Sequence, residues 1–150
     1  MSKKRHSAIE VAKALLYSAA QDRMKINHLK LQKLLYLLQG WCLYFLNHKF
    51  FDDKIEAQKY GPIIPSIWYT YGEYKNDVIG DSGEPISQLD FKEEELLKEV
   101  WRVYKNYDSL ELSQMVLNLF GNYSFQLTPR ISPKNIKAQF QKLVRESHES

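Results

Sequence analysis

Apolar residues recur at helical spacing along most of the chain, and the longest such pattern runs from Asn27 to about Leu46. Its main stripe consists of Leu31, Leu34, Leu35, Leu38, Cys42, Phe45 and Leu46. Trp41 and several leucines widen that stripe over most of the circumference, which is typical of a helix at the centre of its fold. We therefore expect a central helix here, with Asn27 as its N-cap. Gly40 weakens such a helix, and we expect that another backbone passes close to it.

The same spacing, together with capping residues, predicts further helices on both sides of the central one. Ser7 and Glu10 form a capping box before the first helix, and Asp90 and Glu93 precede a later one in the same way. The remaining predicted helices cover about residues 8–19, 66–74, 91–104, 109–120 and 133–144. Residues 76–89 and 122–131 show little periodicity and read as loops. The pattern predicts a mainly α fold, a single compact bundle of about six helices in one domain spanning residues 1–150.

One short segment has the period of a strand. Residues alternate from Lys54 to Lys59 with the period of a strand, with Ile55, Ala57 and Lys59 on one side. The run is too short to be stable alone, and Tyr60, Gly61 and Pro62 end it. We expect one short β-strand or hairpin between the second and third helices, with Pro65 in the first turn of the third, where its missing amide does no harm.

Composition narrows the class of protein. The 150 residues are 44% hydrophobic and 26% charged, as in ordinary globular domains. A single cysteine excludes an intrachain disulfide and a cysteine-based zinc site. The apolar run from Leu34 to Leu46 is shorter than the roughly 20 residues that span a bilayer, so we expect a soluble, cytoplasmic protein without a membrane partner. The net charge is only +3, but residues 1–33 carry eight lysines and arginines.

Candidate catalytic residues are few. The segment Gly80–Pro85 is similar to the sequence around the nucleophile of chymotrypsin-like proteases, but this helical chain cannot build their two-barrel scaffold, and an exposed loop is the better reading. Cys42 and His48 could be a nucleophile and a base, but Cys42 lies on an apolar helix face. Metal-ligand spacings and phosphate-binding glycine patterns are absent from the sequence. We expect no enzyme activity, no catalytic or metal site and no cofactor.

Two motifs in the second and third helices carry a resemblance to a known family. The segments LKLQKLLYLLQGW (residues 29–41) and FDDKIEAQKYGPIIPSIWYTY (residues 51–71) resemble the SocA-like or Panacea domain, also seen as the phage-associated GepA type. The resemblance is close from Asn27 to Tyr71 and looser through the later helices. Gln58 departs from it, because the family pattern has Trp there. A later family His and Trp have no counterpart in this chain.

The resemblance implies an antitoxin of a toxin–antitoxin pair, which binds a cognate protein toxin directly or acts as a proteolytic adaptor that delivers it to a ClpXP-type protease. The polar and turn residues of the motifs are the candidate platform for the partner, and the variable surfaces around them would choose it. These candidates are Gln32, Lys33, Tyr36, Gln39, Trp41, Glu56, Tyr60, Gly61, Pro62, Pro65 and Tyr69. We also expect Gln32 or Gln39 to hydrogen-bond the backbone of residues 56–62, since buried amides need partners.

A second hypothesis comes from the distribution of charge. The basic N-terminal third could bind phosphate backbones, which would make the chain a nucleic-acid-binding regulatory protein of a prophage or mobile element.

Overall fold

The computed structural model describes residues 5–59, 61–121 and 130–149, and it is a mainly α structure with one two-stranded hairpin. The elements in chain order are α1 (Ala8–Gln21), α2 (His28–Leu46), β1 (Glu56–Gln58), β2 (Gly61–Ile63), α3 (Pro65–Tyr71), the 3₁₀ helix η1 (Gly72–Tyr74), α4 (Phe91–Tyr104), α5 (Ser109–Asn118) and α6 (Pro133–Glu149). The predicted six helices and the hairpin between the second and third are confirmed.

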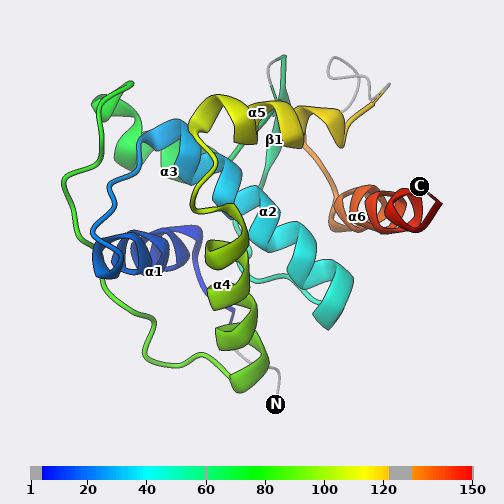
Figure 1. Cartoon of the computed structure of the whole chain (residues 1–150), viewed down its shortest axis with the longest axis horizontal. Helices are drawn as coiled ribbons and strands as arrows, with labels where there is room; N and C mark the ends of the chain where they lie inside the picture. Colours follow the sequence, from blue (N-terminus) through cyan, green and yellow to red (C-terminus); the bar gives the residue numbers. More distant parts are fainter. Residues whose placement is uncertain (1–4, 60, 122–129, 150) are drawn as a thin grey trace.

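Helix α2 runs through the middle of the molecule, and α1, α3, α4, α5, α6 and β2 all pack against it (Figure 1). The predicted stripe is fully buried from Leu31 to Cys42, but its last two members are not, because Phe45 is 63% exposed and Leu46 is half-buried. Because apolar side chains cover most of its circumference, α2 can pack against neighbouring elements on several sides at once. The longest apolar pattern in the sequence is therefore the axis around which the fold is arranged.

The predicted caps are present. The Asn27 side chain accepts a hydrogen bond from the Lys30 amide (2.8 Å) at the start of α2. Ser7 with Glu10 and Asp90 with Glu93 form the predicted capping boxes before α1 and α4, and Asp108 with Glu111 forms another before α5. These local hydrogen bonds satisfy amide groups that a helix start leaves free, so each helix begins where its sequence predicts.

The expected reason for Gly40 was wrong. The atoms nearest to a Cβ added at Gly40 belong to the aromatic ring of Phe140, on α6, and not to a backbone, and the first of them would be 2.0 Å away. Phe140 is fully buried and also packs edge-on against Trp41, with ring centroids 4.8 Å apart. Glycine is therefore required because a neighbouring side chain fills the space of its missing methyl group.

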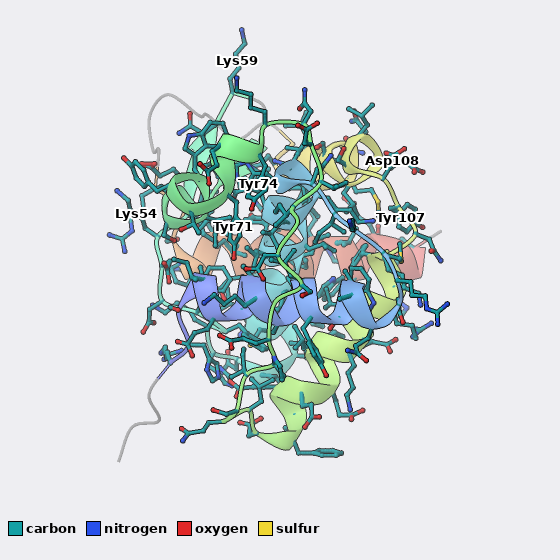
Figure 2. All side chains as sticks on the ribbon, turned by 90° about the vertical axis from the view of Figure 1, so that its left-hand side faces the viewer. Lys54, Lys59, Tyr71, Tyr74, Tyr107 and Asp108 are labelled. Atoms are coloured by element: carbon teal, nitrogen blue, oxygen red, sulfur yellow. The ribbon has the colours of Figure 1, made fainter. Side chains whose placement is uncertain are left out.

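The hairpin differs in detail from its prediction. Gly61 and Pro62, expected as turn residues, begin the second strand, in which Gly61 pairs with Gln58 and Pro62 with Ala57. Ile55 and Ala57 are buried as the alternation predicts, whereas Lys59 follows the end of β1 and extends into solvent (Figure 2). The predicted third helix is divided, because α3 ends at Tyr71 and a 3₁₀ turn follows.

The C-terminal helix is only partly buried. Ile136 and Phe140 of the predicted stripe are in the core, but Leu143 is exposed and Val144 is half-buried. Before the helix, the Ile131 amide donates to the Ile55 carbonyl (2.9 Å), which ties this segment to the start of the hairpin. Most of the loop predicted for residues 122–131 lies outside the described residues.

The protease-like segment forms part of a loop that rests on α1. Gly83 has a φ of +69°, and a Cβ there would lie 2.1 Å from the Lys13 carbonyl oxygen. The next amide, of Glu84, donates to that same oxygen (3.1 Å). The glycine thus allows the loop to touch the helix backbone, which is a structural reason for this sequence.

Candidate functional site

Two glutamines of α2 act as clamps on the segment that contains the hairpin. The Ile64 amide donates to Gln32 Oε1 (2.8 Å), and Gln32 Nε2 donates back to the Ile64 carbonyl (3.2 Å). Gln39 Oε1 accepts from the amides of Phe50 (2.8 Å) and Phe51 (3.2 Å), while its Nε2 donates to the Phe51 carbonyl (2.8 Å). Both side chains are buried, and the clamps hold the segment at its two ends. The prediction that they bond residues 56–62 was wrong in position.

Lys33 makes the contact that was expected of the glutamines. Its Nζ donates to the Pro62 carbonyl (3.3 Å) and lies 3.1 Å from the place where a Cβ of Gly61 would be. The side chain is only 2% exposed and has no carboxylate partner among the described residues. Burial lowers the pKa of Lys33 from its ordinary value of 10.5 to about 8. Gly61, with a φ of +120°, provides the room that this buried amine needs.

His28 completes the polar row at the start of α2. Gln32 Nε2 lies 3.1 Å from His28 Nε2 and can only donate, so this ring nitrogen accepts. Burial, and secondarily the charge of Lys33, lower the pKa of His28. A neutral imidazole fits both observations.

Two further motif residues face the C-terminal half of the chain. The fully buried Tyr36 donates from its hydroxyl to Gln139 Oε1 on α6 and stacks on Phe120. Trp41 Nε1 donates to the Tyr104 hydroxyl on α4 (2.9 Å). Each aromatic side chain combines a large apolar surface with one satisfied polar group, as buried tyrosines and tryptophans usually do. These residues join α2 to α4 and α6.

The remaining motif candidates belong to the hairpin and α3. Glu56 is half-buried opposite Ile63, with its carboxylate 4.0 Å from Lys54 Nζ. Pro62 is buried in β2, and Pro65 occupies the first turn of α3 as predicted. Tyr60 lies outside the described residues. Tyr69 is different from all of these, because 87% of it is exposed.

Three elements that meet the start of α2 carry exposed apolar side chains, which we together call the aromatic face: Trp68 and Tyr69 of α3, Val78 of the following loop, and Leu110 of α5. Their exposed fractions are 54%, 87%, 49% and 74%, in that order. The Trp68 ring lies 5.0 Å from that of His28, while Asn27 pairs with Val78 in a β-bridge and donates to the Ser109 hydroxyl (3.4 Å).

Three elements far apart in sequence thus meet at the first residues of α2. Figure 2 shows the arrangement, with α3 on one side, the entry to α5 at Tyr107 and Asp108 on the other, and α2 between them. The sequence motifs did not indicate Trp68, Val78 or Leu110 as site residues. The only signal was the aromatic character of residues 68–71, because helical spacing does not reveal which exposed residues the fold will bring together.

The geometry around Cys42 and His48 does not activate the thiol. His48 Nδ1 lies 3.8 Å from the buried Cys42 sulfur but also 3.0 Å from the Lys49 carbonyl oxygen. A carbonyl oxygen only accepts, so Nδ1 carries the proton and cannot take one from the thiol. Within the described ranges, no group of three or more His, Cys, Asp or Glu side chains could hold a metal ion, and no helix is long and apolar enough to cross a membrane.

Most described cations of the basic N-terminal third are already engaged. Arg5 pairs with Asp52 (3.4 Å) and Lys13 with Glu84 (3.6 Å). Lys30 is buried and donates to the Lys105 carbonyl (2.6 Å), and Lys33 is also buried. Among the described cations of residues 5–33, Arg23 and Lys25 are left without an ion pair or a side-chain hydrogen bond.

The fold and the site define a class: a helical scaffold whose motif side chains clamp its own backbone, with an exposed aromatic face beside them. A family model described as "Antitoxin SocA-like, Panacea domain" matches residues 31–119, more than half of the chain. The chain belongs to this family, which brings with it a general antitoxin role and, in general terms, a toxin partner. No curated protein and no solved structure matches the chain.

Proposed function

We propose that this chain neutralises a protein toxin by direct contact, and that the toxin binds on the aromatic face. The observation that carries the proposal is the exposure of Trp68, Tyr69, Val78 and Leu110 around one helix start. Tryptophan and tyrosine are favoured anchors of protein interfaces, because each buries a large area and loses little conformational freedom. An exposed apolar group of this kind is typical of an interaction site.

The burial of the motif residues supports the proposal, because it excludes these side chains as the contact surface for a partner. Gln32, Lys33, Tyr36 and Gln39 are at most 2% exposed, so a partner cannot reach them without opening the fold. Gln32, Lys33 and Gln39 hold the backbone of Phe50, Phe51, Pro62 and Ile64, and Ile64 directly precedes α3. A support of this kind lowers the conformational cost of ordering the face on binding.

The activity we propose is binding without chemical turnover, in the cytoplasm. Neutralisation could proceed by occlusion of the toxin or by its delivery to a ClpXP-type protease. The two mechanisms differ in one measurable respect. Occlusion neutralises an equimolar amount of toxin when the protease is absent, whereas an adaptor requires the protease and shortens the lifetime of the toxin.

The test is co-expression with the products of the adjacent reading frames, followed by co-purification and titration. We expect one product to be toxic alone, to be neutralised by this chain and to elute with it. Trp68→Ala and Tyr69→Ala should each weaken the complex by tenfold or more.

Phe91→Ala is the matched control, because Phe91 is also an exposed aromatic side chain (77%) but lies in the first turn of α4. It should leave affinity unchanged. Equal loss in all three variants, or none in any, would contradict the proposed face. The absence of both rescue and co-purification for every neighbouring product would contradict toxin binding itself.

A further inference from the structure

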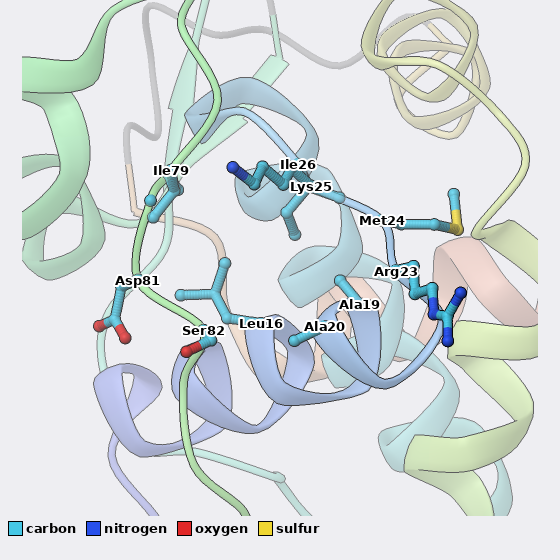
Figure 3. Close-up of a pocket in the computed structure, with 11 residues that line it drawn as sticks. Leu16, Ala19, Ala20, Arg23, Met24, Lys25, Ile26, Ile79, Asp81 and Ser82 are labelled. Carbon is cyan, nitrogen blue, oxygen red and sulfur yellow. The ribbon is translucent and has the colours of Figure 1, made fainter.

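A pocket of about 330 Å³ lies beside the aromatic face, between the end of α1, the connector to α2 and the loop that follows η1 (Figure 3). Most of its lining is apolar. These apolar residues are Leu16, Ala19, Ala20, Met24, Ile26 and Ile79. The pocket adjoins the aromatic face, because Val78 of that face immediately precedes Ile79.

The loop over the pocket is fastened at both ends. The Ile79 amide donates to the Ile26 carbonyl (2.9 Å), and the Glu84 amide donates to the Lys13 carbonyl (3.1 Å). Between these two bonds, Gly80 to Ser82 form a wall without another backbone hydrogen bond to α1. The concavity is thus built by the fold, and a ligand would find it already formed.

The net charge of the lining residues is positive, because Arg23 and Lys25 outnumber one carboxylate, Asp81. Within the described part of the chain, neither cation has an ion pair or a side-chain hydrogen bond. Asp81, on the opposite wall, accepts a hydrogen bond from the Gly83 amide (2.8 Å) and keeps its negative charge. The neighbouring Asp22 carboxylate binds Trp101 Nε1 (2.7 Å) and Lys105 Nζ (3.2 Å).

The backbone of Arg23 closes the end of α1. Its φ of +57° is in the left-handed region, and the amide of the next residue, Met24, donates to the Ala19 carbonyl (2.8 Å), as at many helix C-termini. This turn places Arg23 between the helix and the connector that line the pocket.

We propose that the pocket is the receptor for an anchor of the partner toxin, formed by one large apolar side chain with an acidic residue beside it. A cavity of about 150 Å³ takes a benzene ring, so this pocket has room for a phenylalanine or leucine side chain together with part of the neighbouring residue. Anchors of interfaces commonly fill such pockets. Arg23 and Lys25 extend to different sides of the pocket (Figure 3), and an acidic residue beside the anchor would be attracted to whichever cation it approaches, which favours this segment over a basic or neutral one. The inference rests on the proposed function, since it assigns the anchor to the toxin.

The first test uses defined peptides with blocked ends and needs no toxin. Glu-Phe-Glu, Glu-Ala-Glu and Lys-Phe-Lys are titrated separately into the ¹⁵N-labelled chain. We expect Glu-Phe-Glu to shift the amide signals of Ala20, Ile26 and Gly80 in a saturable manner, with weaker binding as salt rises. The other two peptides should leave those signals in place. Equal shifts from all three peptides, or shifts confined to other regions, would overturn the proposal.

The second test measures the dissociation constant of the toxin complex. Ala20 is half-buried in the lining, so Ala20→Leu should fill the pocket from its floor. The double change Arg23→Glu with Lys25→Glu reverses the charge of the rim. Each variant should weaken toxin binding by tenfold or more, whereas Lys92→Glu, an exposed change on α4, should not.

Circular dichroism and the unfolding midpoint must remain at the wild-type values in these variants. If the wild type binds a toxin and both pocket variants bind it equally well, the pocket inference is wrong and the proposed function stands. If the wild type binds no toxin, the proposed function is wrong, and the peptide titration alone then decides whether the pocket takes an acidic apolar segment.

Discussion

The buried polar side chains of α2 and the exposed apolar side chains of the aromatic face reverse the usual placement of residues in proteins. Gln32, Lys33 and Gln39 are inside, where every polar atom that leaves water needs a hydrogen-bond partner. Trp68 and Tyr69 are largely outside, where their apolar surface gains nothing from the fold. The first group stabilises this chain, while the second has surface available for another molecule.

The difference teaches that most of the polar motif residues hold the fold together: Gln32, Lys33 and Gln39 are buried, and among the described motif candidates only Tyr69 is largely exposed and belongs to the proposed toxin face. The family motif keeps two glutamines seven positions apart, which places both on one side of α2 and lets them hold both ends of the segment from Phe50 to Ile64. The pocket, in contrast, takes Leu16 to Ile26 from outside the matched range and the loop from inside it. Partner choice can therefore change without a change in the motif.

The largest expected effect on stability comes from breaking a clamp. Gln39→Ala leaves two buried amides and one carbonyl of Phe50 and Phe51 without partners, at about 1–3 kcal/mol each, so we expect a loss of about 4 kcal/mol. Urea unfolding measures it. Gln58→Ala, at an exposed position of β1, should stay within about 0.5 kcal/mol. If Gln39→Ala also lowers the free energy of unfolding by only about 0.5 kcal/mol, the hydrogen bonds of Gln39 do not stabilise the fold more than an exposed glutamine does.

The next effect depends on pH. Because the pKa of Lys33 is about 8 when folded and 10.5 ordinarily, the unfolded chain binds more protons between these values, and stability should rise as pH increases through that window. The cost of the buried charge is fully present below pH 8. The rise from this group is about 3 kcal/mol by pH 10.5.

Lys33→Met should lack this rise, whereas Lys98→Met, an exposed control on α4, should retain it. The free energy of unfolding at pH 7, 8, 9 and 10 gives the comparison. Parallel curves for the wild type and Lys33→Met would show that Lys33 is not the buried amine described above.

Substitutions on the aromatic face should have the smallest effect on stability. Tyr69→Ala removes a side chain that is 87% exposed, so the free energy of unfolding should change by about 0.5 kcal/mol or less. Toxin affinity should nevertheless fall by tenfold or more, as proposed above. Thermal unfolding and a binding titration on the same preparation test both. A large loss of stability would show that Tyr69 stabilises the fold, as the buried motif residues do, and would contradict its exposure on the aromatic face.

Local patterns in the sequence were sufficient for the helices and their beginnings. Capping boxes such as Ser7 with Glu10 involve residues three positions apart, and the leucine stripe of α2 follows from helical geometry alone. The family was also within reach, because its two motifs are contiguous segments. The position of α2 at the centre followed from how much of its circumference is apolar.

Only the tertiary structure decided what the polar and small residues do. Periodicity cannot tell that Gln39 clamps Phe50 and Phe51, or that the ring of Phe140 lies over Gly40, since each is a contact between different elements. The aromatic face and the pocket join α1, α3, α5 and a long loop, which no single stretch of sequence connects. Hydrogen bonds and packing at long range depend on how the helices are placed around α2, and that placement is a property of the folded chain.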